Sequence, residues 1–338
     1  MESDRTGSFF ALEKNVRDRL LGILFSLLCT ISFSTEDVLL YVLVKDFHPC
    51  LILLFNSTVS FTLCILLDLT LKPQRPTTIK QFLLVIILGG LNCIGQVATA
   101  TAIFAIGPGS AVSLLFTSPI FTTAYSVLFL RTKLQVKDVF FAICSTFGVS
   151  LLTRYLTLIE DQALTDIFLV VFGSAIAIVG AMAFAGTLIV GRKVAYFETH
   201  SLVIILSYSF QYSIVAIVLC SAFNAWQTPK TLPSLVLLLG TGLTTFGGML
   251  FGYLAVCYEK PTVVAVLLTT EVIMTFIGQF AILNFPFHWT VTVGSALILF
   301  SCVGILLFQS HDDEDNYNEH GHDDESGHIV KPSNSLQN

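Results

Sequence analysis

The chain has 338 residues, of which 54% are apolar and 12% charged, with a net charge of −6 and a mean hydropathy of +0.81. A soluble domain carries about 25% charged residues to cover its surface, so the composition excludes a soluble globular protein. The 8 cysteines are scattered, and their spacing matches neither a zinc site nor a disulfide framework.

Apolar runs predict ten membrane-spanning helices, because about 20 consecutive apolar residues cross the hydrocarbon core. The first five are expected near residues 20–44, 50–69, 81–106, 110–130 and 138–153. After a polar loop, the second five are expected near residues 168–190, 201–223, 235–257, 262–283 and 289–308. The first run is long and lacks a cleavage site, so we expect a retained span rather than a signal peptide.

The third and fourth predicted helices have a counterpart 153 residues later. Residues 102–130 read AIFAIGPGSAVSLLFTSPIFTTAYSVLFL, and residues 255–283 read AVCYEKPTVVAVLLTTEVIMTFIGQFAIL. In this register the matched pairs are Gly95 and Gly248, Ala102 and Ala255, Pro108 and Pro261, and Ser118 and Glu271, while His48 and His200 match to within one residue. Such self-similarity indicates a duplicated architecture. We expect a first repeat at residues 19–154 and a second at 167–308, after a tail at 1–18 and before a disordered acidic, His-containing tail at 309–338.

The basic residues predict the orientation. With the N-terminus in the cytosol, 14 of the 17 lysines and arginines fall on the cytosolic side, and the others are Lys45, Arg154 and Lys230. This bias follows the positive-inside rule and places both termini in the cytosol. Because five spans is an odd number, the repeats are inverted, as in many secondary transporters with a binding site near the midplane. We expect a multi-pass protein of the plasma membrane or of the endoplasmic reticulum and Golgi.

Several short motifs resemble a known family. They are the turn at residues 107–109 before the fourth span, the FTSP motif at Phe116–Pro119, Gly148-Val149 and the TVTVGSAL stretch at Thr290–Leu297. With the ten-span duplication, they resemble the EamA-type drug/metabolite transporter superfamily, and within it subfamily G of solute carrier family 35, over about residues 18–308. Two departures are Arg131-Thr132-Lys133, which lacks the usual Glu, and Val272 where Pro often follows the acid. The resemblance implies transport of metabolites such as organic anions or nucleotide-linked sugars.

Acidic residues inside the spans are the first candidate site residues, since ionisable groups are costly in a membrane. Glu271 lies about mid-span, and burial disfavours the charged form of a carboxylate. Glu271 could carry a coupling proton, hold a cationic substrate group, or be a protonated acid bonded to a neighbouring helix. Glu36 and Asp37, further along the first span, either face a cavity or are hydrated near the outer mouth.

Polar residues give further candidates. Pro119 predicts a kink because it has no N–H for the carbonyl of Leu115. Beside it, Thr117 and Ser118 either bind substrate or re-satisfy the backbone. Three amides, Asn92, Gln96 and Gln211, either line the cavity or form interhelical hydrogen bonds. Small-residue faces, at Gly248 and Gly252 and at Ala177, Ala181 and Ala185, predict packing within the monomer or a homodimer contact.

The C-terminal tail carries four histidines among acidic residues. His311, His320, His322 and His328 are weak candidates for metal binding, with a solvated acidic tail as the alternative. We predict no structural metal and no cofactor, and the chain shows no P-loop, nucleophile elbow or Rossmann fingerprint, so neither an enzyme nor a nucleic-acid partner is expected.

The leading hypothesis is an all-α secondary transporter of a small organic metabolite in the lipid bilayer, an organic anion among the options. Alternating access would be driven by the solute gradient or by protons. No Lys or Arg lies inside the predicted spans, which makes nucleotide sugars less favoured than simpler solutes. Two alternatives stay open: a non-transporting membrane protein that regulates another membrane protein, and a divalent-cation transporter.

Overall fold

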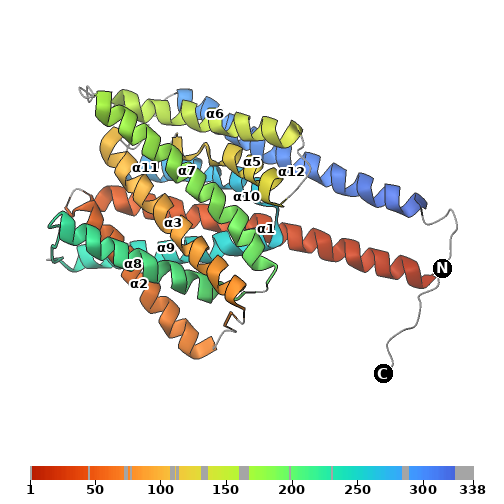
Figure 1. The fold of residues 1–338 in the computed structure, drawn as a ribbon. Coiled ribbons are helices and arrows are strands. Elements are labelled where there is room, and N and C mark those ends of the chain that lie inside the picture. The colour runs from red at the N-terminus through yellow and green to blue at the C-terminus, as the bar shows by residue number, and fades with distance from the viewer. Residues whose placement is uncertain are drawn as a thin grey trace.

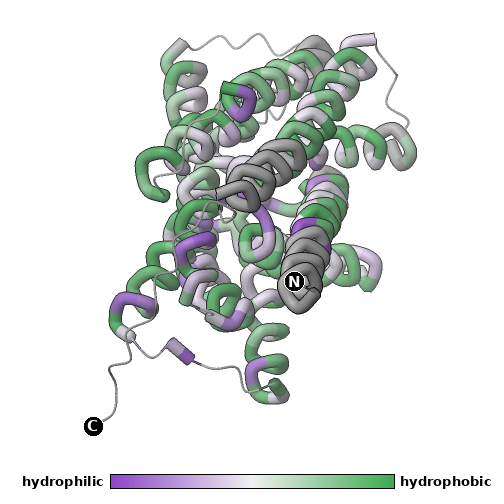
Figure 2. The backbone as a smooth tube through the Cα atoms, turned by 90° about the vertical axis from the view of Figure 1, so that its right-hand side faces the viewer, coloured by the Kyte–Doolittle hydropathy of each residue, from purple (hydrophilic) through white to green (hydrophobic). Residues whose placement is uncertain are grey.

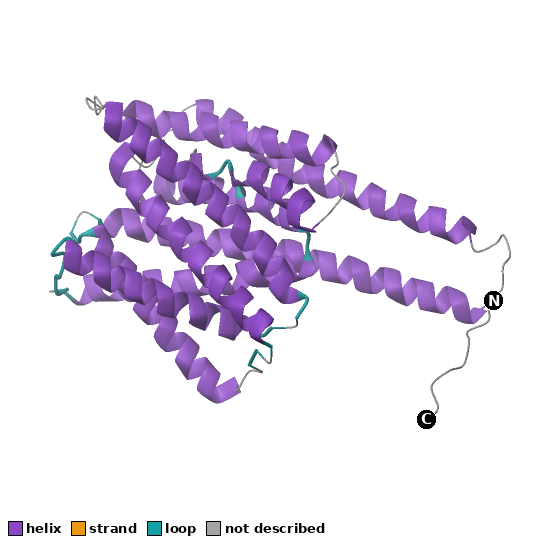
Figure 3. Cartoon of the chain, in the orientation of Figure 1, coloured by secondary structure: helices purple, strands orange, loops and turns teal. Residues whose placement is uncertain are grey.

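The computed structural model describes residues 2–44, 46–71, 75–76, 78–106, 111, 114–130, 136–159, 167–197, 199–229, 231–283 and 289–323. Within these ranges the chain is helical and contains no β-strand (Figure 3). A helix satisfies its backbone N–H and C=O groups within one segment, which is what a lipid environment demands. Hydrophobic residues run along most of the described helices (Figure 2).

The helices before residue 160 are α1 (Glu2–Leu43), α2 (Pro49–Leu71), α3 (Ile79–Ile106), α5 (Ser118–Leu130) and α6 (Val136–Ile159). Those after residue 166 are α7 (Ile167–Ala195), α8 (Ser201–Ala222), α9 (Leu232–Tyr258), α10 (Pro261–Leu268), α11 (Thr270–Leu283) and α12 (Trp289–Asp323). By length and hydropathy, 7 segments in the described residues could span a membrane, and Ser118–Leu130 and Thr292–Phe308 are shorter apolar helices. The structure thus confirms an all-helical membrane protein.

The two histidines that the sequence register matches have the same role. His48 Nδ1 accepts a hydrogen bond of 3.3 Å from the N–H of Cys50 at the start of α2. His200 Nδ1 accepts one of 3.3 Å from the N–H of Leu202 at the start of α8. Each imidazole therefore satisfies a backbone donor that the first turn of a helix leaves unpaired.

The main helix pairs are α1 with α9, α3 with α7, α2 with α8 and α6 with α12 (Figure 1). Every pair joins a helix before residue 160 to one after residue 166. In addition, α5 packs on α7 and α11 packs on α1. The core therefore lies between the two halves of the chain, and the N-terminal end of α1 and the C-terminal end of α12 project in the same direction (Figure 1).

The small residues pack inside the chain. A Cβ on Gly248 would lie 2.6 Å from the ring of Phe33, and one on Gly252 would lie 3.2 Å from Cys29 Sγ, so α1 and α9 approach closely there. Ala177, Ala181 and Ala185 are fully buried in α7. These contacts match the expectation of packing within the monomer, and a homodimer stays a prediction.

Two predicted spans differ from the structure. The span expected to be continuous over residues 262–283 is broken at Thr269 into α10 and α11, which corrects that prediction. The span expected at 110–130 has a turn at residues 116–117, and α5 begins at Ser118. The predicted turn at 107–109 lies outside the described residues.

The first and last helices are longer than expected. α1 begins at Glu2, and α12 continues to Asp323 although the sequence predicts a disordered tail from residue 309. Extending a helix that is already nucleated adds one hydrogen bond for each residue fixed, so a span can propagate into polar sequence. The side chains of residues 2–16 and 309–323 lie outside the described structure, as do residues 324–338.

Candidate substrate and coupling site

The break between α10 and α11 is stabilised by threonines. The N–H of Thr269 donates to the Val266 carbonyl at 3.1 Å. The hydroxyls of Thr269 and Thr270 donate to the carbonyls of Val266 and Leu267 at 2.6 and 2.7 Å. These bonds satisfy carbonyls that the interrupted helix leaves unpaired, which allows irregular backbone inside an apolar interior.

The break before α5 uses the same chemistry. Thr117 donates twice to the Leu114 carbonyl, from its N–H at 3.1 Å and from its hydroxyl at 2.7 Å. The N–H of Ile120 then donates to the Thr117 carbonyl at 3.0 Å, which starts the new helix around Pro119. The half-buried Ser118 is the first residue of α5. The Thr117 hydroxyl is thus bonded to the backbone, and its role in substrate binding stays a prediction.

Glu271 lies in the first turn of α11, directly after the break, and is half-buried. It interacts electrostatically with Asp37 and Glu36 of α1. One turn further along α11, the hydroxyl of Thr275 donates to Asp37 Oδ2 at 3.1 Å. A Cβ on Gly278 would lie 2.8 Å from Val38 Cγ2, so the two helices are in close contact. The fold therefore brings Glu271 and Asp37 from two distant segments to one interface, with Glu36 next to Asp37 on α1.

Glu36 and Asp37 point in different directions, since neighbours on a helix are about 100° apart. Asp37 is exposed and contacts α11. Glu36 is only 9% exposed, and its Oε1 accepts a hydrogen bond of 2.8 Å from Asn56 Nδ2 of α2. Thr245 of α9 lies beside the same carboxyl group. Sequence reasoning missed Asn56, although an amide in the middle of an apolar span is itself a signal.

The three acids have no basic partner among the residues that the structure describes. Among the described residues, Glu36, Asp37 and Glu271 form no ion pair with Lys, Arg or His. One unpaired acid at the centre of a span costs about 3 kcal/mol, so three ionised acids are unfavourable without a neutralising proton or cation. Among the described residues, no group of three His, Cys, Asp or Glu could hold a metal ion.

The amide candidates lie in helix contacts. Asn92 Nδ2 donates to the Leu88 carbonyl of its own helix at 3.3 Å, and Gln96 is half-buried on the same helix. Gln211 Nε2 donates to Ser207 Oγ at 3.1 Å and across to the Ile86 carbonyl of α3 at 3.4 Å. The hydrogen bonds of Asn92 and Gln211 therefore do not reach the acids. The four tail histidines belong to side chains that the structure leaves undescribed.

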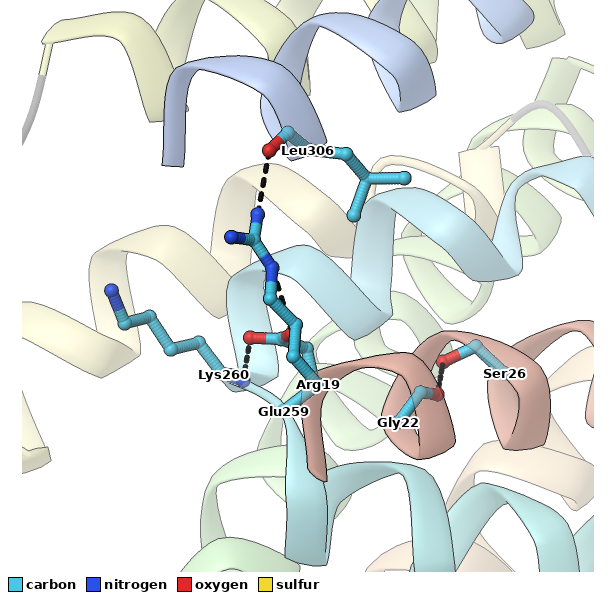
Figure 4. A network of polar contacts seen from close by, with 6 residues as sticks. All are labelled: Arg19, Gly22, Ser26, Glu259, Lys260 and Leu306. Atoms are coloured by element: carbon cyan, nitrogen blue, oxygen red, sulfur yellow. Dashed lines mark hydrogen bonds and ion pairs between the residues drawn. The ribbon is translucent and has the colours of Figure 1, made fainter. Parts of the chain in front are cut away.

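A second polar network joins α1 and α12 to the turn between α9 and α10 (Figure 4). Arg19 of α1 lies 3.7 Å from Glu259 Oε2 through its Nε and donates from Nη2 to the Leu306 carbonyl of α12. Glu259 Oε1 accepts a hydrogen bond of 2.9 Å from the N–H of Lys260 at the start of α10. A Cβ on Gly22 would lie 2.7 Å from Glu259 Cβ, so α1 presses against this turn. The network holds one end of the bundle together, and sequence reasoning missed it.

Comparison with known proteins places the chain in a class. Residues 20–154 match the EamA-like transporter family. Solute carrier family 35 member G1 of Homo sapiens is 25% identical over 295 residues, which cover 85% of this chain and 79% of that protein. The Mus musculus protein of the same name is 27% identical over 205 residues, covering 58% of this chain and 54% of that protein.

One crystal structure shares the fold, with a TM-score of 0.69 over 85% of this chain and 96% of that chain at 14% identity. The fold and the comparisons together support a multi-pass membrane transporter of small solutes. The chain carries an EamA domain and resembles subfamily G of solute carrier family 35.

Proposed function

We propose that this protein is a proton-coupled secondary transporter that carries a small organic metabolite by alternating access. The observation that supports it best is the approach of Glu271 and Asp37 at the α1–α11 interface beside a broken helix, with Glu36 next to Asp37 on α1. Broken helices with polar groups at mid-depth are the usual substrate and ion sites of secondary transporters. Acids without counter-charges suit a site that takes up and releases protons.

The proposed architecture is ten spans in two inverted five-helix repeats, residues 19–154 and 167–308. Two observations support it. First, the helix pairs follow the symmetry of two repeats. If each helix is replaced by its counterpart in the other repeat, the pair α1–α9 becomes α7–α3, whereas the pairs α2–α8 and α6–α12 become themselves. All four pairs are present. Second, Ser118, which begins α5, and Glu271, in the first turn of α11, follow the two helix breaks and match in the repeat register. Rocking of one repeat against the other would expose the site to each side in turn.

In the proposed cycle, Asp37 and Glu271 form the accessible part of the site. A proton on either acid removes a negative charge, which lowers the repulsion toward an organic anion and makes the loaded site less costly to bury. An anionic metabolite would therefore travel with protons, whereas a cationic one would replace them. The remaining polar candidates, Asn92, Gln96, Thr117, Ser118 and Gln211, are proposed only as outer contacts.

The Arg19–Glu259 network is proposed to be the cytosolic closure of the transporter. It ties α1 to the α9–α10 turn and to α12, so opening on that side requires breaking the ion pair. In the same region Arg192 of α7 donates to the carbonyls of Val256 and Cys257, each at 2.7 Å. Arginine at the C-terminus of a helix satisfies orphan carbonyls and complements the helix dipole.

The test is solute-driven proton movement in proteoliposomes, with a panel of di- and tricarboxylates, nucleotide sugars, amines and zinc. We expect one solute class to move protons with the wild-type protein and not with Glu271→Gln. Asp46→Asn is the matched control, because Asp46 is an exposed acid in the α1–α2 turn. Proton movement that persists in Glu271→Gln would show that this residue is not the coupling group. If no solute in the panel moves protons with the wild-type protein, that result would count against transport of these solutes.

A further inference from the structure

Two buried oxygen atoms of one residue pair lack partners. Asn56 Nδ2 donates to Glu36 Oε1 at 2.8 Å. The other oxygen atoms of the same two groups, Glu36 Oε2 and Asn56 Oδ1, are buried without a hydrogen bond in the described structure. The two residues are 9% and 1% exposed. Buried polar atoms of this kind are rare in proteins and need an explanation.

The numbers of hydrogen-bond donors and acceptors in the pair favour a protonated acid. An ionised carboxylate only accepts hydrogen bonds, whereas an amide has two N–H donors and one accepting oxygen. An ionised Glu36 therefore offers nothing to Asn56 Oδ1. A protonated Glu36 has one O–H donor, so a single proton can satisfy both unpaired oxygen atoms and close a two-bond acid–amide pair.

The groups around Glu36 also favour the protonated form of its carboxyl group. Among the described residues, the titratable groups near it are Asp37 on the same helix, Glu271 on α11, and Tyr208 and Tyr212 on α8. None of these groups is a cation, and two are acids, so a second or third negative charge is disfavoured. A metal ion would find only two oxygen ligands in this pair, and no group of three His, Cys, Asp or Glu is available among the described side chains.

We propose that Glu36 and Asn56 form a buried proton-binding pair, in which Glu36 Oε2–H donates to Asn56 Oδ1 and Asn56 Nδ2 donates to Glu36 Oε1. Loss of the proton removes one of the two bonds between α1 and α2 and leaves two acceptors facing each other. Occupancy of the pair is thereby linked to the packing of α1 on α2. The presence of the proton is inferred from the structure alone, whereas its use in transport rests on the proposed function.

The first measurement is infrared spectroscopy of the full chain in nanodiscs, comparing H₂O with D₂O to identify the carbonyl band of protonated carboxyl groups. Glu36→Gln should remove one such band, since its amide can form the same two bonds with Asn56 but carries no titrating proton. Asn56→Leu should shift that band to higher frequency, because the carbonyl loses its donor. Glu271→Gln should leave the band in place, which separates the pair from the accessible site.

Glu36→Gln keeps the proposal testable because it preserves the hydrogen-bonding pattern and should melt at the wild-type temperature. An unchanged band in this variant would overturn the proposal, and so would thermal stabilisation by Na⁺ that Glu36→Gln abolishes, because the ligand would then be a metal cation. If the band is lost in Glu36→Gln while the wild type transports no member of the solute panel, the proton-binding pair stands and the proposed transport of those solutes fails.

Discussion

Thr275 of α11 donates a hydrogen bond of 3.1 Å to Asp37 of α1, although the two residues are 238 positions apart in the chain. This bond orients an exposed acid toward Glu271, which lies one turn earlier on α11. Helix α1 is thus held against the broken span at the level of the break. Movement of α11 relative to α1 would change the environment of Asp37 and Glu271 together.

Thr275→Val should impair transport while the fold is retained. Valine has a similar shape, so the variant loses about 1 kcal/mol for the hydrogen bond and frees Asp37 to move away from Glu271. We expect solute flux in proteoliposomes to fall several-fold. Thr244→Val is the control, because the Thr244 hydroxyl donates to the Gly240 and Thr241 carbonyls of its own helix. Equal flux in the two variants would argue against a role for the Thr275–Asp37 bond.

Arg19→Gln should open the proposed cytosolic closure. The variant loses the ion pair with Glu259 and the hydrogen bond from Arg19 Nη2 to the Leu306 carbonyl. A hydrogen bond of a charged group contributes about 2 kcal/mol, so this loss should shift the closure equilibrium by roughly tenfold or more. The readout is the rate of maleimide labelling at Cys257, a half-buried thiol beside the network, with the other seven cysteines replaced.

Glu259→Gln should raise labelling of Cys257 by a similar factor, and the double variant should add little, because both changes remove one interaction. Cys144 of α6 is also half-buried and serves as the control thiol in a matched single-cysteine protein. A labelling rate at Cys257 that neither variant changes would refute the closure role.

Gly248→Ala should destabilise the protein through the α1–α9 contact. Its new Cβ would lie 2.6 Å from the ring of Phe33, so the ring and helix must shift, at about 1–3 kcal/mol for overpacking. Gly240→Ala on the same helix is the control, because its Cβ would meet Leu39 Cδ1 at an ordinary 3.6 Å. Thermal unfolding should separate the two variants by several degrees, and identical melting curves would contradict the packing argument.

Gln211→Leu should affect stability rather than substrate binding. The Gln211 amide bonds Ser207 and the Ile86 carbonyl and lies against Gly89 in the α3–α8 contact. Its loss should lower stability by about 1 kcal/mol and leave KM for the transported solute unchanged. A raised KM with an unchanged melting temperature would instead support a role for Gln211 in substrate binding.

Local sequence features determined much of this architecture. Runs of apolar residues about 20 long can only be buried in lipid as helices, so the positions of most spans followed from composition alone. The histidines at positions 48 and 200 were recognisable as a repeated pair because helix starts need a capping acceptor at a fixed offset. The same local rules identified Glu36, Asp37 and Glu271 as candidate site residues, because an ionisable side chain inside a membrane span is energetically costly.

Only the tertiary structure decided how these residues combine. No proline marks the break at Thr269 in the sequence. The break depends instead on the hydroxyls of Thr269 and Thr270, which satisfy backbone carbonyls. The partnership of Glu36 with Asn56, of Asp37 with Thr275 and of Arg19 with Glu259 joins different helices. Hydrophobic periodicity sets which segments become helices, but in a chain that is apolar on most faces it does not specify which helices touch; close approach at small residues and the pairing of buried polar groups decide that.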